Sequence, residues 1–123
     1  MIAGVVEAGR EAVIELSVRG PDGREQAVNA LIDTGFTGFL TLPSGLIQTL
    51  RATRIGRSRA VLADGAVVLL QLVEVDVDWD GAWRTVRANV VDTGALVGMG
   101  LLAGYRFCLD ATVDGRVTIE ALS

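Results

Sequence analysis

The stretch that decides the fold is Leu-Ile-Asp-Thr-Gly-Phe-Thr-Gly at residues 31–38. Two large apolar residues precede Asp33, which is typical of a strand that ends at the carboxylate. Gly35 and Gly38 then allow a sharp turn and a close approach of the backbone, and the Thr34 hydroxyl can tie the loop together. Asp-Thr-Gly also occurs in ordinary turns. The flanking apolar segments favour a rigid loop that aims Asp33 at a ligand.

The segments around this stretch also indicate strands. Residues 12–19 alternate apolar and polar side chains, residues 20–23 (Gly-Pro-Asp-Gly) form a strong turn signal, and residues 25–32 return as the second strand of a hairpin. Residues 39–42 predict a short strand that stops at Pro43. Ser44 is expected to cap a short helix that runs to Leu50.

The second half of the chain continues this pattern. Residues 61–72 are apolar but interrupted by Asp64-Gly65, a type I′ hairpin signal, and residues 73–78 alternate. A tight turn at Asp80-Gly81 precedes a strand over residues 83–91, and residues 105–109 and 116–119 form a last hairpin. The sequence therefore predicts one all-β domain over residues 1–123, with one or two short helices.

The composition excludes several classes of function. The chain has 123 residues, half of them hydrophobic, a net charge of −4 and no histidine. Without histidine, Ser-His-Asp and Cys-His catalysis and most zinc sites are excluded, so we expect no metal and no cofactor. No basic stripe suggests a nucleic-acid partner. Cys108 is the single cysteine, which excludes an internal disulfide, and we expect it to be a core residue.

The sequence gives no sign of a membrane or secretory segment. The N-terminus lacks a basic segment followed by a long apolar run. The longest apolar run, residues 66–70, is far too short to span a bilayer. We therefore expect a soluble cytoplasmic protein without a membrane partner.

Three segments, in this order, resemble the retropepsin-like aspartic proteases, including their small bacterial single-domain members. Residues 30–38 resemble the catalytic loop, Ala63-Asp64-Gly65 within an apolar hairpin resembles the flap, and residues 96–100 resemble the hydrophobic-hydrophobic-Gly signature. Two features depart from the family. Gly100 stands where Asp or Asn is common, and no Tyr or Trp lies close to the tip of the flap.

The resemblance implies a closed β-barrel of the acid-protease type with one lobe per chain. It implies that Asp33 is the catalytic carboxylate, within the loop that includes Thr34 and Gly35, and that a homodimer joins two such carboxylates around a peptide substrate. Two close carboxylates share one proton, so one can activate water as a general base. The residues expected to contact the substrate are Phe36, Leu62, Ala63, Asp64 and Gly65. The alternative is a non-catalytic β-barrel that keeps this fold for binding or dimerisation.

A second Asp-Thr-Gly occupies residues 92–94. It follows an apolar strand as the first one does, so the two halves of the chain could be diverged repeats in which Asp92 occupies the position of Asp33. A dyad of Asp33 and Asp92 within one chain is an alternative to the homodimer, although a two-lobed enzyme needs far more residues. We expect Asp92 to be a turn residue on a surface loop.

Overall fold

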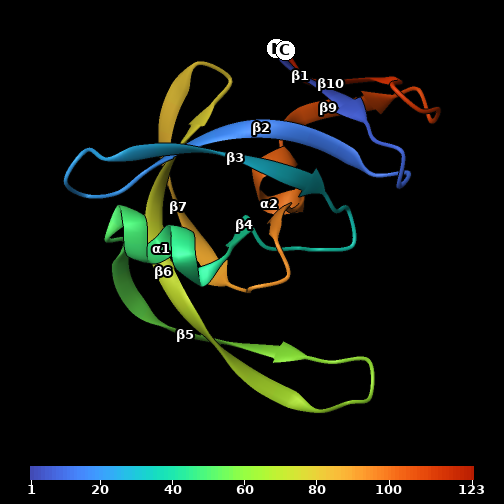
Figure 1. The fold of residues 1–123 in the computed structure, drawn as a ribbon. Coiled ribbons are helices and arrows are strands. Elements are labelled where there is room, and N and C mark those ends of the chain that lie inside the picture. Colours follow the sequence, from blue (N-terminus) through green and yellow to red (C-terminus); the bar gives the residue numbers. More distant parts are fainter.

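The computed structural model describes residues 1–123 as ten strands of one continuous sheet and two short helices (Figure 1). The elements in chain order are β1 (Ile2–Val6), β2 (Ala12–Arg19), β3 (Glu25–Ile32), β4 (Leu40–Leu42), α1 (Ser44–Leu50), β5 (Thr53–Val61), β6 (Val67–Trp79), β7 (Ala82–Val90), β8 (Ala95–Val97), α2 (Met99–Leu102), β9 (Tyr105–Leu109) and β10 (Arg116–Ala121). The expected all-β fold with short helices is confirmed.

The middle of the sheet closes into a six-stranded barrel. Its strands follow one another in the order β6, β7, β4, β8, β3 and β2, and a further pairing of β2 with β6 completes the ring. Two junctions are parallel, β3 with β8 and β4 with β7, and the other pairings are antiparallel. Closure removes the free edges from this part of the sheet.

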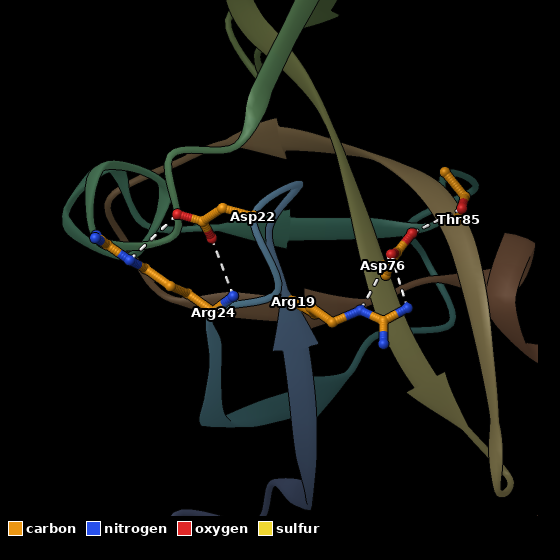
Figure 2. A network of polar contacts seen from close by, with 5 residues as sticks. All are labelled: Arg19, Asp22, Arg24, Asp76 and Thr85. Atoms are coloured by element: carbon orange, nitrogen blue, oxygen red, sulfur yellow. Dashed lines mark hydrogen bonds and ion pairs between the residues drawn. The ribbon is translucent and has the colours of Figure 1, made fainter.

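The junction of β2 and β6 spans only two residue pairs, Val18 with Val77 and Arg19 with Asp76. Side chains reinforce it, as Figure 2 shows: the Arg19 guanidinium donates to Asp76 Oδ2 from Nε (3.3 Å) and from Nη2 (3.1 Å). Thr85 Oγ1 donates to the other oxygen of Asp76 at 2.7 Å, and the guanidinium lies 4.1 Å from the centre of the Trp83 ring. Asp76 therefore stabilises the closure of the barrel.

The barrel is filled by the apolar residues of the alternating strands. On β2, Ile14, Leu16 and Val18 are buried while Glu15 is exposed, as the alternation predicts. On β6 the residues from Val73 to Trp79 alternate in the same way. Since successive side chains of a strand point to opposite faces, one polar and one apolar face result.

Helix α1 covers one end of the barrel with Leu46, Ile47 and Leu50, all buried. Its bounds agree with the sequence, but its N-terminus does not begin as expected. Pro43 is the N-cap residue and no side chain at that position caps the helix. The Ser44 amide instead donates to Asp92 Oδ1 at 2.8 Å, so a distant carboxylate caps the first turn.

Strands β5 and β6 form a long hairpin, called the flap below. Strand β7 pairs with β6 only as far as Leu72, so beyond that residue the flap is a two-stranded arm that projects from the barrel (Figure 1). The predicted type I′ turn at its tip is wrong. Only Gly65 has a positive φ (84°), whereas a type I′ turn needs two such residues. Gly65 N–H donates to the Leu62 carbonyl, and Asp64 Oδ1 accepts the Ala66 amide at 2.9 Å.

Strands β1, β10 and β9 extend the sheet beyond β2, and β9 is its outer edge. Cys108 lies on this edge strand and is exposed, so its expected place in the core is wrong. The register of β9 with β10 places Phe107 and Leu109 on the face opposite to Cys108. Neither helix is long and apolar enough to cross a membrane.

Candidate functional site

Asp33 follows the last residue of β3, in the parallel junction with β8 where Ile32 pairs with Val97. The Asp33 amide donates to the Val97 carbonyl at 2.9 Å, which continues the ladder by one residue. The carboxylate turns back over its own loop, and Oδ1 accepts the Gly35 amide at 2.9 Å. Asp33 is half-buried, and its second oxygen has no hydrogen-bond partner in the chain.

The loop after Asp33 crosses the start of α2 in close backbone contact. The amides of Met99, Gly98 and Gly100 donate to the carbonyls of Phe36, Phe39 and Gly38 at 2.8, 3.0 and 2.9 Å. A Cβ on Gly98 would lie 2.2 Å from the Gly38 carbonyl oxygen, so only glycine fits there. The hydrophobic-hydrophobic-Gly segment, residues 96–100, therefore holds the Asp33 loop in place through backbone hydrogen bonds.

The same crossing leaves no room for a side chain at residue 100. A Cβ at this position would lie 2.9 Å from the Gly38 carbonyl oxygen and 3.1 Å from the Phe39 ring. An aspartate or asparagine would therefore force the crossing apart, and the backbone hydrogen bond from Gly100 to Gly38 supplies the bracing instead.

A groove with a volume of about 370 Å³ opens beside Asp33. We call it the β9-side groove, because the edge strand β9 forms one of its walls. Its lining residues are Arg10, Glu11, Ala12, Leu31, Ile32, Asp33, Thr34, Leu96, Phe107 and Leu109. A mostly apolar groove with two carboxylates and one guanidinium is the kind of surface that binds a peptide side chain.

A second groove, of about 290 Å³, lies on the other side of the loop, between it and the base of the flap. We call it the flap-side groove. Its lining residues are Thr37, Gly38, Phe39, Leu40, Ser58, Leu72, Arg87 and Asn89. Ser58 Oγ donates to Asn89 Oδ1 at 2.6 Å and so fixes the flap to β7 at this point. The Asp33 loop is thus flanked by two hollows.

The structure brings only part of the predicted site together. Asp33 and Thr34 line the β9-side groove, and Gly35 binds the carboxylate. The Phe36 ring packs against Gly38 and Gly98 and lines neither groove, so in this chain its contacts are structural.

The predicted flap residues lie apart from Asp33. Leu62, Ala63, Asp64 and Gly65 are exposed at the tip of the arm and line neither groove of the single chain. Figure 1 shows the tip on the same side of the barrel as the loop after β3. Their contact with a substrate stays a prediction.

Sequence reasoning missed residues that come from the two ends of the chain. Arg10, in the β1–β2 turn, and Phe107 and Leu109, on β9, all line the β9-side groove. The shared face of Phe107 and Leu109 could have been predicted, because the alternation of a strand places the first and last residues of Phe-Cys-Leu on one side. The position of Arg10 could not, because only the folded turn brings it next to β3.

Asp92 lies at the other end of β8. The parallel register pairs residues 30–32 with residues 95–97, so Gly98, and not Asp92, lies opposite Asp33. The expected repeat is nevertheless visible in the pairing, because β3 pairs in parallel with β8 and β7 pairs in parallel with β4, and Asp33 and Asp92 lie in the loops that follow β3 and β7. Asp92 precedes the start of β8 while Asp33 lies beside its end, so the length of this strand, about 10 Å, separates them. A dyad within one chain does not form.

Asp92 has its own structural partner. Its carboxylate accepts the Ser44 amide at the start of α1, and this hydrogen bond, followed by one from the Ser44 side chain, lowers the pKa of Asp92. Thr41 completes the loop: its hydroxyl donates to the Gly94 carbonyl at 3.1 Å and accepts the Leu96 amide at 2.9 Å. The expectation of a turn residue on a surface loop is confirmed, with the addition of a helix cap.

Comparisons with protein-family models, with curated proteins and with solved structures found no match to this chain. The resemblance to retropepsin-like proteases therefore stays a prediction. What supports it is the geometry of residues 33–38, the two grooves and the projecting flap.

Proposed function

We propose that this chain is one subunit of a homodimeric aspartic endopeptidase of the retropepsin-like type. The observation that carries the proposal is Asp33. Its carboxylate lies at the end of a barrel strand, on a backbone braced by Gly98, with one oxygen held by Gly35 and the other without a partner beside a groove. A carboxylate that is fixed in position and accessible is suited to acid/base chemistry.

The chain supplies one such carboxylate, and the mechanism needs two. Asp92 caps α1 and Asp76 closes the barrel, so both have structural partners already. A second copy of the chain, related by a two-fold axis, would supply a second Asp33. Peptide hydrolysis without histidine can then proceed through two carboxylates that share a proton.

In the proposed reaction, the ionised carboxylate takes a proton from a water molecule, and the water oxygen attacks the carbonyl carbon of the peptide bond. The protonated carboxylate donates a hydrogen bond to the carbonyl oxygen and stabilises the tetrahedral intermediate. The proton then passes to the leaving amine as the C–N bond breaks. Gly35 keeps one carboxylate oxygen in place throughout.

The flap gives the proposal a second support. Large apolar side chains are exposed along it, namely Ile55, Val61, Leu62, Val67 and Leu69. Clusters of this kind mark surfaces that are covered by a partner or a ligand. We propose that the flap folds over an extended peptide, which would bind in β-strand fashion between the flap and the Asp33 loop.

The test is cleavage of a diverse peptide library by the purified protein, at acid to neutral pH, with new termini identified by mass spectrometry. We expect internal peptide bonds to be cut, and a peptide mimic with a hydroxyl in place of the scissile carbonyl to inhibit. A verified dimer that cuts no peptide and ignores the mimic would contradict the proposal and favour a non-catalytic binding barrel.

A further inference from the structure

One unpaired cation lies beside Asp33. Arg10 lines the β9-side groove and also a second cavity of about 330 Å³ between the β1–β2 turn and the β9–β10 loop. Ala12 and Leu109 line both hollows too, so they form a continuous trough that runs from Asp33 to Val113. Arg10 is the only basic residue along this trough.

The backbone at Arg10 gives no reason for an arginine. The β1–β2 turn is closed by hydrogen bonds from Arg10 N–H to the Glu7 carbonyl and from Glu7 N–H to the Glu11 carbonyl, both 2.9 Å. Arg10 occupies the left-handed position of this turn, with φ of 64°. Glycine or asparagine adopts this conformation at lower cost. A strained residue at a groove points to a role for its side chain.

Neither of the nearby acids neutralises Arg10. Glu7 and Glu11 belong to the same turn, but the ion pairs of the chain involve other groups and none includes Arg10. A Glu11 carboxylate oxygen lies over Gly9, 3.3 Å from the place of a Cβ on that residue. The guanidinium thus remains available for a carboxylate from outside the chain.

We propose that Arg10 binds an acidic side chain of the polypeptide ligand, so that the enzyme prefers glutamate or aspartate close to the scissile bond. The preference for a cleavage position rests on the proposed function, whereas the binding of an acidic peptide does not. Because a homodimer carries two copies of Arg10 related by a two-fold axis, the preference appears at two positions, one on each side of the scissile bond.

The experiment uses peptide pairs that differ only by Glu or Gln, scanned along a cleaved sequence. We expect the wild type to show a kcat/KM for the Glu peptide about 10- to 100-fold above that for its Gln partner, as a charge-assisted hydrogen bond predicts. Arg10→Gly should bring this ratio to about one without lowering the melting temperature, since glycine relieves the backbone. Arg10→Lys should keep part of the preference.

Arg51→Gly is the matched control. Arg51 is also exposed, lacks an ion pair and has a left-handed backbone (φ 51°), but it lines neither groove. The ratio should stay at the wild-type value in this variant. An Arg10→Gly enzyme that keeps the wild-type ratio would overturn the proposal. If Arg10→Gly keeps the wild-type Glu/Gln ratio and also forms weaker dimers, Arg10 lies at the subunit interface and the proposal is overturned as well.

Binding of the same peptides to the Asp33→Asn protein separates this inference from the proposed function. If Asp33→Asn binds the Glu peptide more tightly than the Gln peptide, and the double variant Asp33→Asn/Arg10→Gly binds both equally, the role of Arg10 is supported even if the wild type cuts nothing. Equal binding of the Glu and Gln peptides would overturn that role even if the wild type is an active protease.

Discussion

Residues 33–35 and 92–94 carry the same tripeptide, Asp-Thr-Gly, yet the two aspartates have different partners. Asp33 binds the amide of Gly35 within its own loop and keeps one oxygen beside a groove. Asp92 reaches across the fold to the Ser44 amide and caps a helix. A motif of three residues therefore does not determine which partners its carboxylate binds; the strands and helices around it do.

The position of β8 relative to β3 sets the difference between the two loops. This strand runs beside β3 in the same direction, so its C-terminal end, Val97-Gly98, meets Asp33, and its N-terminal end begins after Asp92. The backbone of Gly98 is hydrogen-bonded to the Asp33 loop, whereas the Asp92 loop is hydrogen-bonded to Thr41 and to the start of α1. The two loops therefore differ in what supports them as well as in what they offer.

The largest effect should separate the two aspartates by activity. Asp33→Asn removes the carboxylate that each subunit contributes to the proposed dyad and should lower kcat/KM by about 10²- to 10⁴-fold, the usual contribution of general acid–base catalysis. Asp92→Asn should retain most of the wild-type activity, because the asparagine oxygen can still accept the Ser44 amide. Both are measured on one cleaved peptide, with dimer content checked by sedimentation. Equal losses in two folded dimers would contradict the assignment.

The next effect concerns the glycines that support each loop. In Gly98→Ala the new methyl group would collide with the Gly38 carbonyl oxygen, and we expect a loss of ~3 kcal/mol or more in the free energy of unfolding. Gly94→Ala meets no atom within 4 Å and is strained only by its φ of 125°, so a loss of ~1–2 kcal/mol is expected. Urea unfolding measures both. A Gly98→Ala protein as stable as Gly94→Ala would show that the crossing at Asp33 is not tightly packed.

These contrasts also show what the sequence could predict. Local patterns were sufficient for β2 and β3, where alternation and a Gly-Pro-Asp-Gly turn set the strands, and for the bounds of α1. They also placed Asp33 at the end of a strand, because an apolar segment leads into it. In each case the signal lies within a few neighbouring residues.

Long-range pairing was not predictable in the same way. The parallel register of β3 with β8 depends on how the barrel closes, so the sequence did not show that Gly98 lies opposite Asp33. Strand β5 was missed because most of it is exposed and rich in arginine, which hides the alternation of a half-buried strand. Arg10 reaches the groove only because the turn between β1 and β2 folds there.

A smaller effect should show that the Asp33 site is shared between subunits. When inactive Asp33→Asn protein is mixed with wild type and subunits exchange, random pairing leaves fewer wild-type dimers. At about a ninefold excess of the variant, activity per wild-type subunit should fall to about one tenth. An equal excess of Asp92→Asn should not inhibit, which provides the control. Activity that is unchanged at full exchange would mean that one chain holds a complete site.

The smallest effect should be the stability contributed by the Asp92 charge. Its pKa is lowered by the Ser44 amide and then by the Ser44 side chain, so the folded state holds the ionised form more tightly than the unfolded state does. The stabilisation is therefore fully present above the unfolded pKa, near pH ~4, and is lost as the pH falls through the lower folded pKa.

Asp92→Asn keeps the hydrogen-bond acceptor and removes the charge, so it should unfold at lower urea than the wild type at pH 7. The two midpoints should converge as the pH drops below the lowered folded pKa of Asp92. Asp92→Ala also removes the acceptor from Ser44, so it should remain less stable than the wild type even in acid. If the difference in urea midpoint between wild type and Asp92→Asn grows toward low pH, the charge of Asp92 does not stabilise α1.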